Sequence, residues 1–338
     1  MKRFSPVTVF VFLAILFVVV AAVEISVGPM WLPLSRIIPD TRAYFLGSHS
    51  ADAVVMGAIR LPRVVVALFV GAGLASTGAV LQAVFRNPMA DPGVIGVSSG
   101  AALGAVFSMQ LGAAAIGIWA VPMFAFVAGL ITVFVIYALA TVKGFTSIYA
   151  LLLAGVAISA LSGAGVDLLL ALSPLQSLQQ ALFWLMGGLD GSTWTNAFIV
   201  GLFFVFGFLI YYIEAPTLDV LSLGDEQAHG VGVHVERKKR LLLTICAFVV
   251  GSCISVSGAI GFVGLIIPHS MRLILGPSHR MLLPASAIGG AILLIASDIV
   301  ARTVMMPVEI NIGIVTSALG VPFFLFLLRK QQRLSRHG

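Results

Sequence analysis

The sequence has few charged residues. Asp, Glu, Lys and Arg make up only 9% of its 338 residues, whereas 60% are hydrophobic and the mean hydropathy is +1.11. A soluble domain has about a quarter of its residues charged, so this composition excludes a soluble globular protein. The chain also lacks the alternating ten-residue segments of a β-barrel, and its apolar blocks approach the ~20 residues that a membrane-spanning helix needs. It is therefore expected to be an all-α integral membrane protein.

Cysteine is also scarce. Cys246 and Cys253 are the two cysteines, and they lie in one apolar block. On a helix they stand about 10 Å apart along the axis, which is too far for a disulfide. We interpret both as core residues.

Motifs for chemistry are missing as well. No G-x-x-x-x-G-K-[ST] phosphate-binding loop occurs, so any ATP dependence must come from a partner. The six histidines form no helical pair of the zinc-protease type, and "GVSSGAALG" does not match the G-x-S-x-G nucleophile motif. A membrane enzyme is therefore a weak hypothesis, and we expect neither a catalytic nor a metal site.

The apolar blocks predict about ten membrane helices, with eight or nine as alternatives because two blocks are short or rich in glycine. The first block is longer than a signal-peptide core, so we expect it to be retained. The expected helices cover residues 5–24, 61–84, 93–110, 118–141, 148–170, 193–213, 241–257, 261–276, 284–302 and 312–328.

The distribution of basic residues predicts the orientation. An even number of spans places both termini on one side, and cytoplasmic loops carry the excess of Lys and Arg. With both termini cytoplasmic, fourteen basic residues lie inside, namely Lys2, Arg3, Arg86, Lys143, Arg237, Lys238, Lys239, Arg240, Arg272, Arg280, Arg329, Lys330, Arg333 and Arg336. Five lie outside, namely Arg36, Arg42, Arg60, Arg63 and Arg302. The net charge of +6 is thus explained by anchoring in a membrane, and nucleic-acid binding is not expected.

Two of the expected helices carry small residues at every fourth position. One ridge contains Ala67, Gly71, Ala75, Ala79 and Ala83, and the other contains Gly155, Ser159 and Gly163. Such ridges let helices approach closely in lipid. Packing within one chain is the first interpretation, and a pathway wall or a dimer interface is the alternative.

The polar segment 215–240 is the longest cytoplasmic stretch in an otherwise single transmembrane domain, 1–338. Its first part is expected to form one or two short helices, broken at Gly224 and at Gly230 or Gly232, before the basic run 237–240. It is either a solvated loop or a docking surface.

Several strings resemble one protein family. They are "IRLPRVVVALFVGAGLASTGAVLQAVFRNPMADPGVIGVSSGAALG", "LLLAGVAISAL", "LGDEQAHGVGV", "SGAIGFVGLIIPHSMRLILGPSHRMLLPASAIGGAILLIASDIVAR" and "IGIVTSALGVPFFLFLL". In order and spacing, from about residue 55 to 328, they are similar to permease subunits of type II ABC importers for iron-siderophores, haem and vitamin B12. The resemblance implies a homodimer of ten-helix subunits in the bacterial or archaeal cytoplasmic membrane, with two copies of a cytoplasmic ATPase and an extracytoplasmic substrate-binding protein.

The resemblance also implies roles for particular residues. Docking of the binding protein falls on Arg60, Arg63 and Arg302, which would meet glutamates of that protein. Coupling to the ATPase falls on Leu223, Gly224, Asp225, Glu226, Ala228, Gly230 and Gly232. The resemblance places the inner gate at Asn87, Met89, Ser147 and Ile148, although relatives often have small hydroxyl residues in place of Ile148 and Tyr149. Ser159 and Gly163, from the second ridge of small residues, are added as candidates for the pathway wall.

The expected function is import of a bulky metal chelate, an iron-siderophore or haem, without a cofactor on this chain and with ATP and Mg²⁺ on the partner ATPase. A corrinoid is the alternative cargo, and an oxyanion comes third. A secondary transporter would need ionisable residues near mid-membrane. The acidic candidates, Asp167 and Asp298, instead lie near the outer ends of their spans, and an i,i+4 pair with Arg302 accounts for Asp298.

Overall fold

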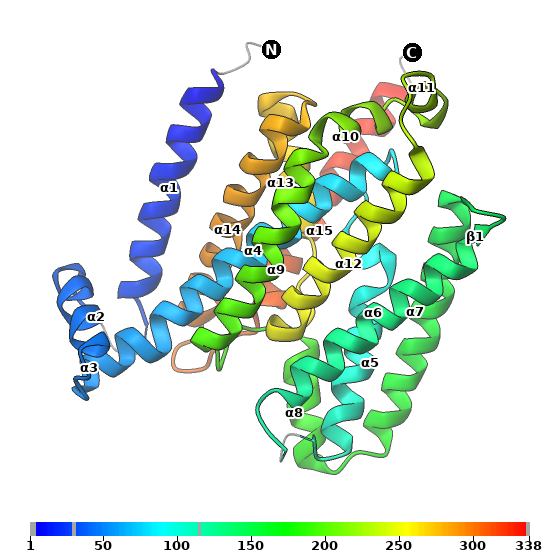
Figure 1. The fold of residues 1–338 in the computed structure, drawn as a ribbon. Helices are drawn as coiled ribbons and strands as arrows, with labels where there is room; N and C mark the ends of the chain where they lie inside the picture. Colours follow the sequence, from blue (N-terminus) through cyan, green and yellow to red (C-terminus); the bar gives the residue numbers. More distant parts are fainter. Residues whose placement is uncertain (1–4, 29–31, 114–115, 336–338) are drawn as a thin grey trace.

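The computed structural model describes residues 5–28, 32–113 and 116–335 and is almost entirely helical (Figure 1). The long helices are α1 (Pro6–Ser26), α4 (Leu61–Val84), α5 (Val97–Gln110), α6 (Ala120–Ala140), α7 (Ile148–Ala171), α9 (Trp194–Ile213), α12 (Val235–Ser257), α13 (Val263–Leu275), α14 (His279–Thr303) and α15 (Ile312–Ser335). Each coincides with one of the expected spans, and α4 has the expected bounds.

Helix length does not establish how many of these cross the membrane. Among the described residues, seven helices are long and apolar enough to do so. The helix α13 and the apolar part of α15 are shorter, and α5 has 14 residues. The largest differences from the expected bounds are at the starts of α12 and α14 and at the end of α15. Helix α12 begins at Val235 and α14 at His279, so their polar first turns are also helical, and α15 continues to Ser335.

Short elements cap the two ends of the bundle. At one end are η1 (Leu34–Arg36), α2 (Ile37–Phe45), α3 (Ala51–Val54), the π-helical turn η2 (Val55–Arg60) and α8 (Leu175–Leu185). The other end carries α10 (Ala215–Leu221), α11 (Asp225–Gly230) and an antiparallel hairpin of β1 (Thr141–Val142) and β2 (Phe145–Thr146). The short 3-10 turn η3 (Pro92–Ile95) precedes α5.

The chain ends support the expected topology. The start of α1 and the end of α15 lie at the same end of the molecule as α10 and α11, whereas α2, α3 and α8 lie at the opposite end (Figure 1). This arrangement fits an even number of crossings. We therefore call the end with α10 and α11 cytoplasmic, and the end with α2 and α8 outer. Lys2, Arg3 and Arg336, which contributed to the count of basic residues, lie outside the described residues.

Helix α4 is the centre of the bundle and packs on α14 at close range. A Cβ atom on Gly71 would overlap the backbone of Gly290, and one on Gly290 would overlap that of Gly71. The small ridge of α4 therefore packs within one chain, as the first interpretation of it predicted. The two cysteines, which are free and fully buried in α12, are confirmed as core residues.

Helix α7 behaves differently from α4. Its Gly155 faces the carbonyl of Val94, and the Ser159 hydroxyl accepts a hydrogen bond from Ser99 at 3.0 Å. By contrast, a Cβ on Gly163 would meet nothing within 4 Å, and large residues such as Leu153 and Leu161 are exposed. The ridge of α7 is thus only partly covered within one chain.

Candidate functional site

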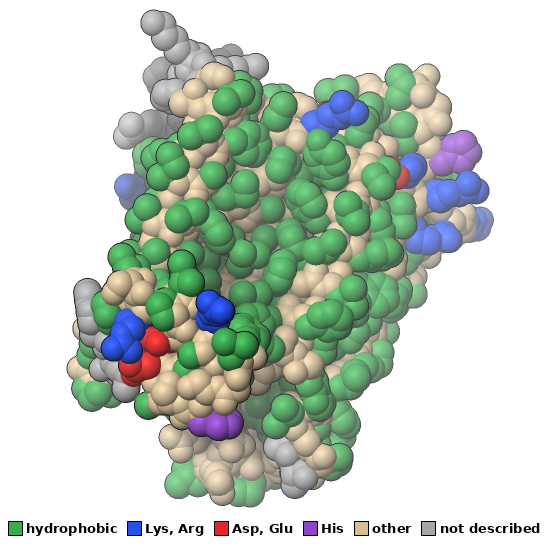
Figure 2. Space-filling view, turned by 60° about the vertical axis from the view of Figure 1, so that its left-hand side comes forward, with side chains coloured by type: hydrophobic (Ala, Val, Ile, Leu, Met, Phe, Trp, Pro, Cys, Tyr) green, Lys and Arg blue, Asp and Glu red, His purple; other side chains and the backbone are tan. Residues whose placement is uncertain are grey.

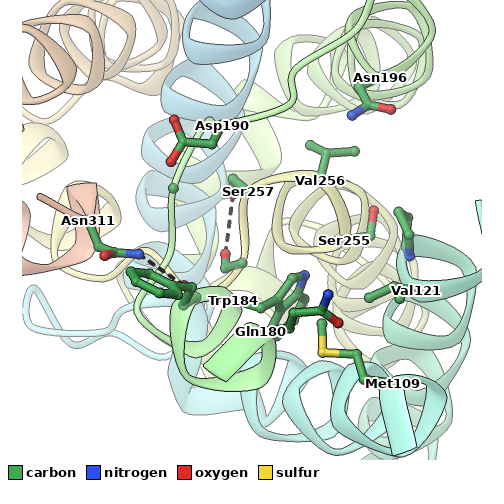
Figure 3. Close-up of a pocket in the computed structure, with 14 residues that line it drawn as sticks. Met109, Val121, Gln180, Trp184, Asp190, Asn196, Ser255, Val256, Ser257 and Asn311 are labelled. Atoms are coloured by element: carbon green, nitrogen blue, oxygen red, sulfur yellow. Dashed lines mark hydrogen bonds between the residues drawn. The ribbon is translucent and has the colours of Figure 1, made fainter. Parts of the chain in front are cut away.

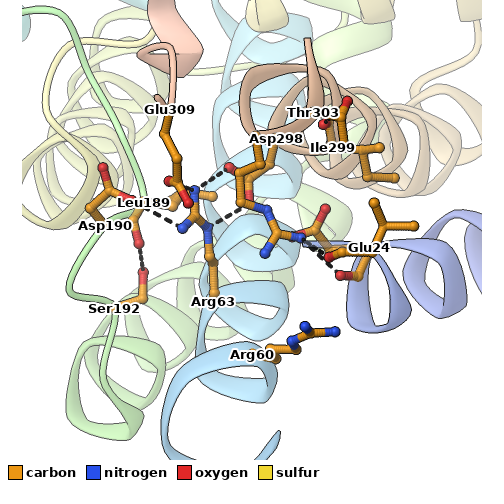
Figure 4. Close-up of polar contacts among 12 residues, drawn as sticks. Glu24, Arg60, Arg63, Leu189, Asp190, Ser192, Asp298, Ile299, Thr303 and Glu309 are labelled. Carbon is orange, nitrogen blue, oxygen red and sulfur yellow. Dashed lines mark hydrogen bonds and ion pairs between the residues drawn. The ribbon is translucent and has the colours of Figure 1, made fainter. Parts of the chain in front are cut away.

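The expected docking arginines form part of a buried charge cluster at the outer end (Figure 4). Arg63, in the first turn of α4, donates to both carboxylate oxygens of Asp298 on α14, with Nε to Oδ2 at 2.7 Å and Nη2 to Oδ1 at 2.8 Å. Two loop residues complete its shell, Asp190 at 3.0 Å and Glu309 at 3.1 Å. Arginine suits this place because its planar group can bind one carboxylate in a bidentate manner and still donate to others.

The other two arginines hold the end of α1. Arg302 forms an ion pair with Glu24 at 2.6 Å and donates to the carbonyls of Glu24 at 2.9 Å and Val27 at 3.1 Å. Arg60 donates to the Ile25 carbonyl. Three helices, α1, α4 and α14, are thus joined by charges at their outer ends.

The geometry of the cluster bears on two of the expectations. Arg60, Arg63 and Arg302, which were expected to meet glutamates of a binding protein, are all buried because the ends of α1, α4 and α14 converge on them. The expected i,i+4 pair of Asp298 with Arg302 is present at 3.9 Å, but the main partner of Asp298 is Arg63 on another helix, at 2.7 Å.

Sequence reasoning missed three of the carboxylates in the cluster, Glu24, Asp190 and Glu309. They lie far from Arg63 and Arg302 in the chain, so spacing does not connect them. The sequence nevertheless contained an indication that the outer arginines have acidic partners within the chain. Five arginines on the outer side oppose the insertion bias, and Glu24 at the end of an apolar block is costly unless it is paired.

The rim of the cluster is open to water. The side chain of Asp190 is 71% exposed, and that of Glu309 is 31% exposed. Partial burial, together with a hydrogen bond to Asp190, raises the pKa of Glu309. The two loop carboxylates therefore bind Arg63 less firmly than the fully buried Asp298 does.

A cavity of about 520 Å³ adjoins the cluster (Figure 3). Its wall combines apolar groups with amides and hydroxyls from α8, α9, α12 and the loop before α15, and it shares Asp190 with the cluster. The polar groups in the wall are Gln180, Asp190, Asn196, Ser255, Ser257 and Asn311. Such a wall, with a single ionisable group, suits a large ligand that is held weakly.

The expected coupling residues form a compact turn at the cytoplasmic end. Gly224, with φ +133°, precedes α11, and Gly232, with φ +85°, follows it. The amide of Val233 donates to the Ala228 carbonyl at 2.9 Å, which closes the helix in the manner of a Schellman motif. The expected short helices, broken at Gly224 and Gly232, are confirmed.

One side of α11 is fixed by contacts within the chain, and the other side, called the free side below, is exposed. Ala228 is buried, and Asp225 forms ion pairs with Lys239 at 2.7 Å and Arg86 at 3.8 Å. Leu223 and Glu226 point outward and are exposed, as is Gly230 at the end of the helix.

The expected gate residues lie in three places. Asn87 and Met89 stand in the loop after α4, where the Asn87 side chain accepts a hydrogen bond from the Met89 amide at 2.9 Å. Ser147 caps α7 by accepting from the Ala150 amide at 3.3 Å, and Ile148 begins that helix. Ser159 and Gly163 lie further along α7. The side-chain hydrogen bonds of Asn87 and Ser147 each stay within their own segment, whereas the backbone amide of Ser147 donates to the Ala140 carbonyl at the end of α6 at 3.2 Å.

Within the part of the chain that the structure describes, no three His, Cys, Asp or Glu side chains are arranged to hold a metal ion. The carboxylates of the outer cluster face arginines instead.

Comparison with known proteins identifies the family. Residues 12–330 match the FecCD transport family. The chain belongs to the FecCD family. It is 47% identical to the cobalamin import system permease protein BtuC of Halobacterium salinarum, over 85% of this chain and 76% of that protein. It is 38% identical to the hemin transport system permease protein HmuU of Yersinia pestis, over 98% of each.

A solved structure agrees with this result. A metal-chelate type ABC transporter in an inward-facing conformation superposes with a TM-score of 0.84 at 32% identity, covering 96% of this chain and 100% of that one. The FecCD protein is therefore a multi-pass permease subunit of an ABC importer in the cytoplasmic membrane. It is a transport component that works with ABC partner subunits, and ATP hydrolysis belongs to a separate ATPase.

We predict that Asp298→Asn destabilises this FecCD protein strongly. The substitution removes the charge that faces the buried Arg63, and breaking a buried ion pair costs about 3–5 kcal/mol. Asp190 and Glu309 remain as partners, so we expect a loss near about 3 kcal/mol in the free energy of unfolding, measured by denaturation in nanodiscs. The control is Asp167→Asn, an exposed carboxylate on α7, which should change stability by less than about 0.5 kcal/mol. Equal stability of both variants and the wild type would contradict the structural role of the pair.

Proposed function

We propose that two copies of this chain form the permease of an importer that moves a bulky metal chelate into the cytoplasm. An extracytoplasmic binding protein delivers the cargo, and two copies of a cytoplasmic ATPase, which bind ATP and Mg²⁺, drive the transport. The observation that carries this proposal is the match to the FecCD family over residues 12–330 in a chain that has no phosphate-binding loop of its own.

The cargo is proposed to be an iron chelate, such as a ferric siderophore or haem. The similarity to a hemin permease over 98% of both chains supports this class. A corrinoid is the second candidate, and the 47% identity to a cobalamin permease favours it. Both cargoes are large, and the outer cavity offers each a wall of amides, hydroxyls and apolar groups.

Transport assays distinguish the two cargoes. The complete importer in proteoliposomes, with its cognate binding protein, is expected to take up one of haem, a ferric siderophore or cobalamin only when ATP is present inside the vesicle. Uptake of cobalamin alone would reject the iron class. Uptake of all three without ATP would reject an ATP-driven permease.

Docking of the binding protein is proposed to occur by exchange of carboxylates at the outer cluster. Arg63 is already occupied, but Asp190 on its open side is mostly exposed, and such a pair is worth only about 0.2–1 kcal/mol. A carboxylate of the binding protein would replace Asp190 and Glu309 while Asp298 keeps Arg63 in place. Arg60 and Arg302 supply further positive charge beside it.

The exchange predicts that Asp190→Asn strengthens docking. Removal of the competing carboxylate should raise the affinity for the binding protein by about two- to five-fold at low salt, with a smaller gain at moderate salt. Binding to immobilised permease in nanodiscs measures both values. Asp167→Asn removes the same charge elsewhere near the outer ends of the helices and should leave the affinity unchanged. A fall in affinity with Asp190→Asn would reject the exchange, and so would an unchanged value.

Coupling to the ATPase is proposed to use the free side of α11. Leu223 is 71% exposed and Glu226 is exposed beside it, whereas the opposite side is fixed to α12 by Asp225 and Lys239. Because this side of α11 is fixed to α12, a displacement of α11 by the ATPase would be transmitted to α12. The positive φ of Gly232 sets the direction in which the chain leaves α11.

We predict that Gly232→Ala uncouples ATP hydrolysis from transport. A Cβ there meets no neighbour within 4 Å, so its cost arises from the left-handed backbone alone, about 1–2 kcal/mol. Uptake per ATP hydrolysed should fall several-fold while the ATPase still assembles. Gly47→Ala is a matched control, because Gly47 also has open space around it and a positive φ, of +86°, but lies between α2 and α3 at the outer end. If both variants transport like the wild type, the turn is not part of the coupling path.

The gate and the dimer interface are proposed to lie on α7. Its ridge around Gly163 has open space beside it and Ser147 at its start is exposed, whereas Ile148 is half-buried against the core. A second copy that covers this ridge would bring two sets of gate residues together, with Asn87 and Met89 at the cytoplasmic end.

A further inference from the structure

A second cavity lies at the cytoplasmic end, between the β1–β2 hairpin and the start of α12. Its volume is about 670 Å³. The hairpin contributes Lys143, Gly144 and Phe145, and the segment that enters α12 contributes the rest of the wall, which is His229, Gly232, Val233, His234, Val235, Glu236, Arg237 and Arg240. The outer cluster does not share this cavity, whereas Gly232 of the coupling turn lines it.

The basic residues around it fall into two groups. Lys238 and Lys239 point away and are neutralised, Lys238 by Glu214 at 2.5 Å and Lys239 by Asp225 at 2.7 Å. Lys143, Arg237 and Arg240 line the cavity and are exposed, and among the described residues no carboxylate oxygen forms an ion pair with any of them within 4.0 Å. The wall of the cavity therefore carries three positive charges and one carboxylate, that of Glu236, which forms an ion pair with Lys239 at 3.8 Å.

The walls of the cavity are fixed to each other. Glu236, in the first turn of α12, accepts a hydrogen bond from the Thr146 amide of β2 at 2.9 Å. Thr146 in turn donates to the Tyr137 hydroxyl at 3.1 Å, and that hydroxyl also interacts with Arg240. The hairpin cannot swing away from α12 without breaking these contacts, so the three cations keep their spacing.

The cavity lies at the depth of lipid head groups. Arg240 is followed directly by the apolar run 241–257, and Lys143 stands between the end of α6 and the start of α7. Beside the cations, Val142 and Phe145 are 67% and 70% exposed. Figure 2 shows basic side chains gathered at one edge of the molecule, next to a broad hydrophobic surface.

We propose that this cavity binds the head group of an anionic phospholipid of the inner leaflet. The phosphate would sit between Lys143, Arg237 and Arg240, and the acyl chains would lie along Val142 and Phe145. Basic pockets on the cytoplasmic side of membrane proteins bind such head groups, and each Lys or Arg near an anionic surface contributes about 1 kcal/mol.

A lipid fits this surface better than an acidic patch of the ATPase does. The exposed Val142 and Phe145 adjoin the cations, and a soluble partner would leave these side chains in water. The free side of α11, with Leu223 and Glu226, offers the ATPase a separate contact that carries no excess of positive charge.

The test compares lipid retention and stability in nanodiscs. Wild-type permease and the variant Lys143→Gln/Arg237→Gln/Arg240→Gln are placed in phosphatidylcholine alone or in phosphatidylcholine with phosphatidylglycerol. Phosphatidylglycerol should raise the Tm of the wild type, and the variant should lose at least half of that gain. Native mass spectrometry should show a three- to ten-fold loss of retained phosphatidylglycerol in the variant.

Controls separate the possible occupants. Arg280→Gln removes an exposed cation at the start of α14 and should keep the full gain, and equal Tm values in phosphatidylcholine alone show that the triple variant is folded. If the triple variant is not folded, the single variant Lys143→Gln, on the exposed hairpin, is compared with the wild type in the same two lipid mixtures. An unchanged gain in the variant would overturn the proposal. Inorganic phosphate that displaces the lipid effect at millimolar concentration would indicate a site for soluble anions, and a loss confined to ATPase affinity would indicate a protein interface. Either result would also overturn the proposal that the cavity binds a lipid head group.

Discussion

The bidentate pair between Arg63 and Asp298 governs the arrangement of the outer half of this protein. A charge in an apolar bundle must face its counter-charge, because no water is present to solvate it. The pair fixes the register of α4 against α14, and the close contact of Gly71 with Gly290 fixes the same two helices further along. Once these two helices are aligned, Arg302 is brought to Glu24, and the loops that carry Asp190 and Glu309 converge on Arg63.

The same requirement explains why the outer cluster contains several carboxylates. Buried arginines need counter-charges within the chain, and Glu24, Asp190, Asp298 and Glu309 supply them. Only the carboxylates of the rim are exposed to water, and the proposed exchange with a binding protein would involve these. Asp298, which is fully buried, and Asp190, which is largely exposed, therefore differ in how firmly they hold Arg63.

The positions of the spans could be predicted from the sequence because lipid imposes a simple requirement on length and apolarity. The short helices at the membrane surface were harder to predict. Helix α8 has an amphipathic pattern that is too short to span, and α12 extends into the basic run 235–240, where hydropathy gives no indication of structure. The turn at Gly232 could be predicted because glycine there serves a purely local geometry.

The partners of the arginines could not be predicted in the same way. Arg63 and Asp298 are 235 residues apart, and spacing in the sequence carries no information about such a pair. A local rule predicted the pairing of Asp298 with Arg302, four residues away, and that ion pair is present at 3.9 Å, but the closer partner, Arg63, comes from another helix. The expected gate residues are a different case. They lie in the loop after α4, at the start of α7 and further along α7, and local sequence patterns do not relate these three places to one another.

The bond between Arg302 and the end of α1 has a consequence for how the protein is made. The two residues joined there, Glu24 and Arg302, are 278 residues apart. At synthesis rates of about 5–20 residues per second, the first helix waits roughly 14–56 seconds in the membrane before its partner leaves the ribosome. During that interval Arg302 is absent, and Arg60, which donates to the Ile25 carbonyl beside Glu24, is the arginine near the end of α1. The arrival of α14 therefore supplies the buried partner that joins the oldest helix of the chain to the bundle.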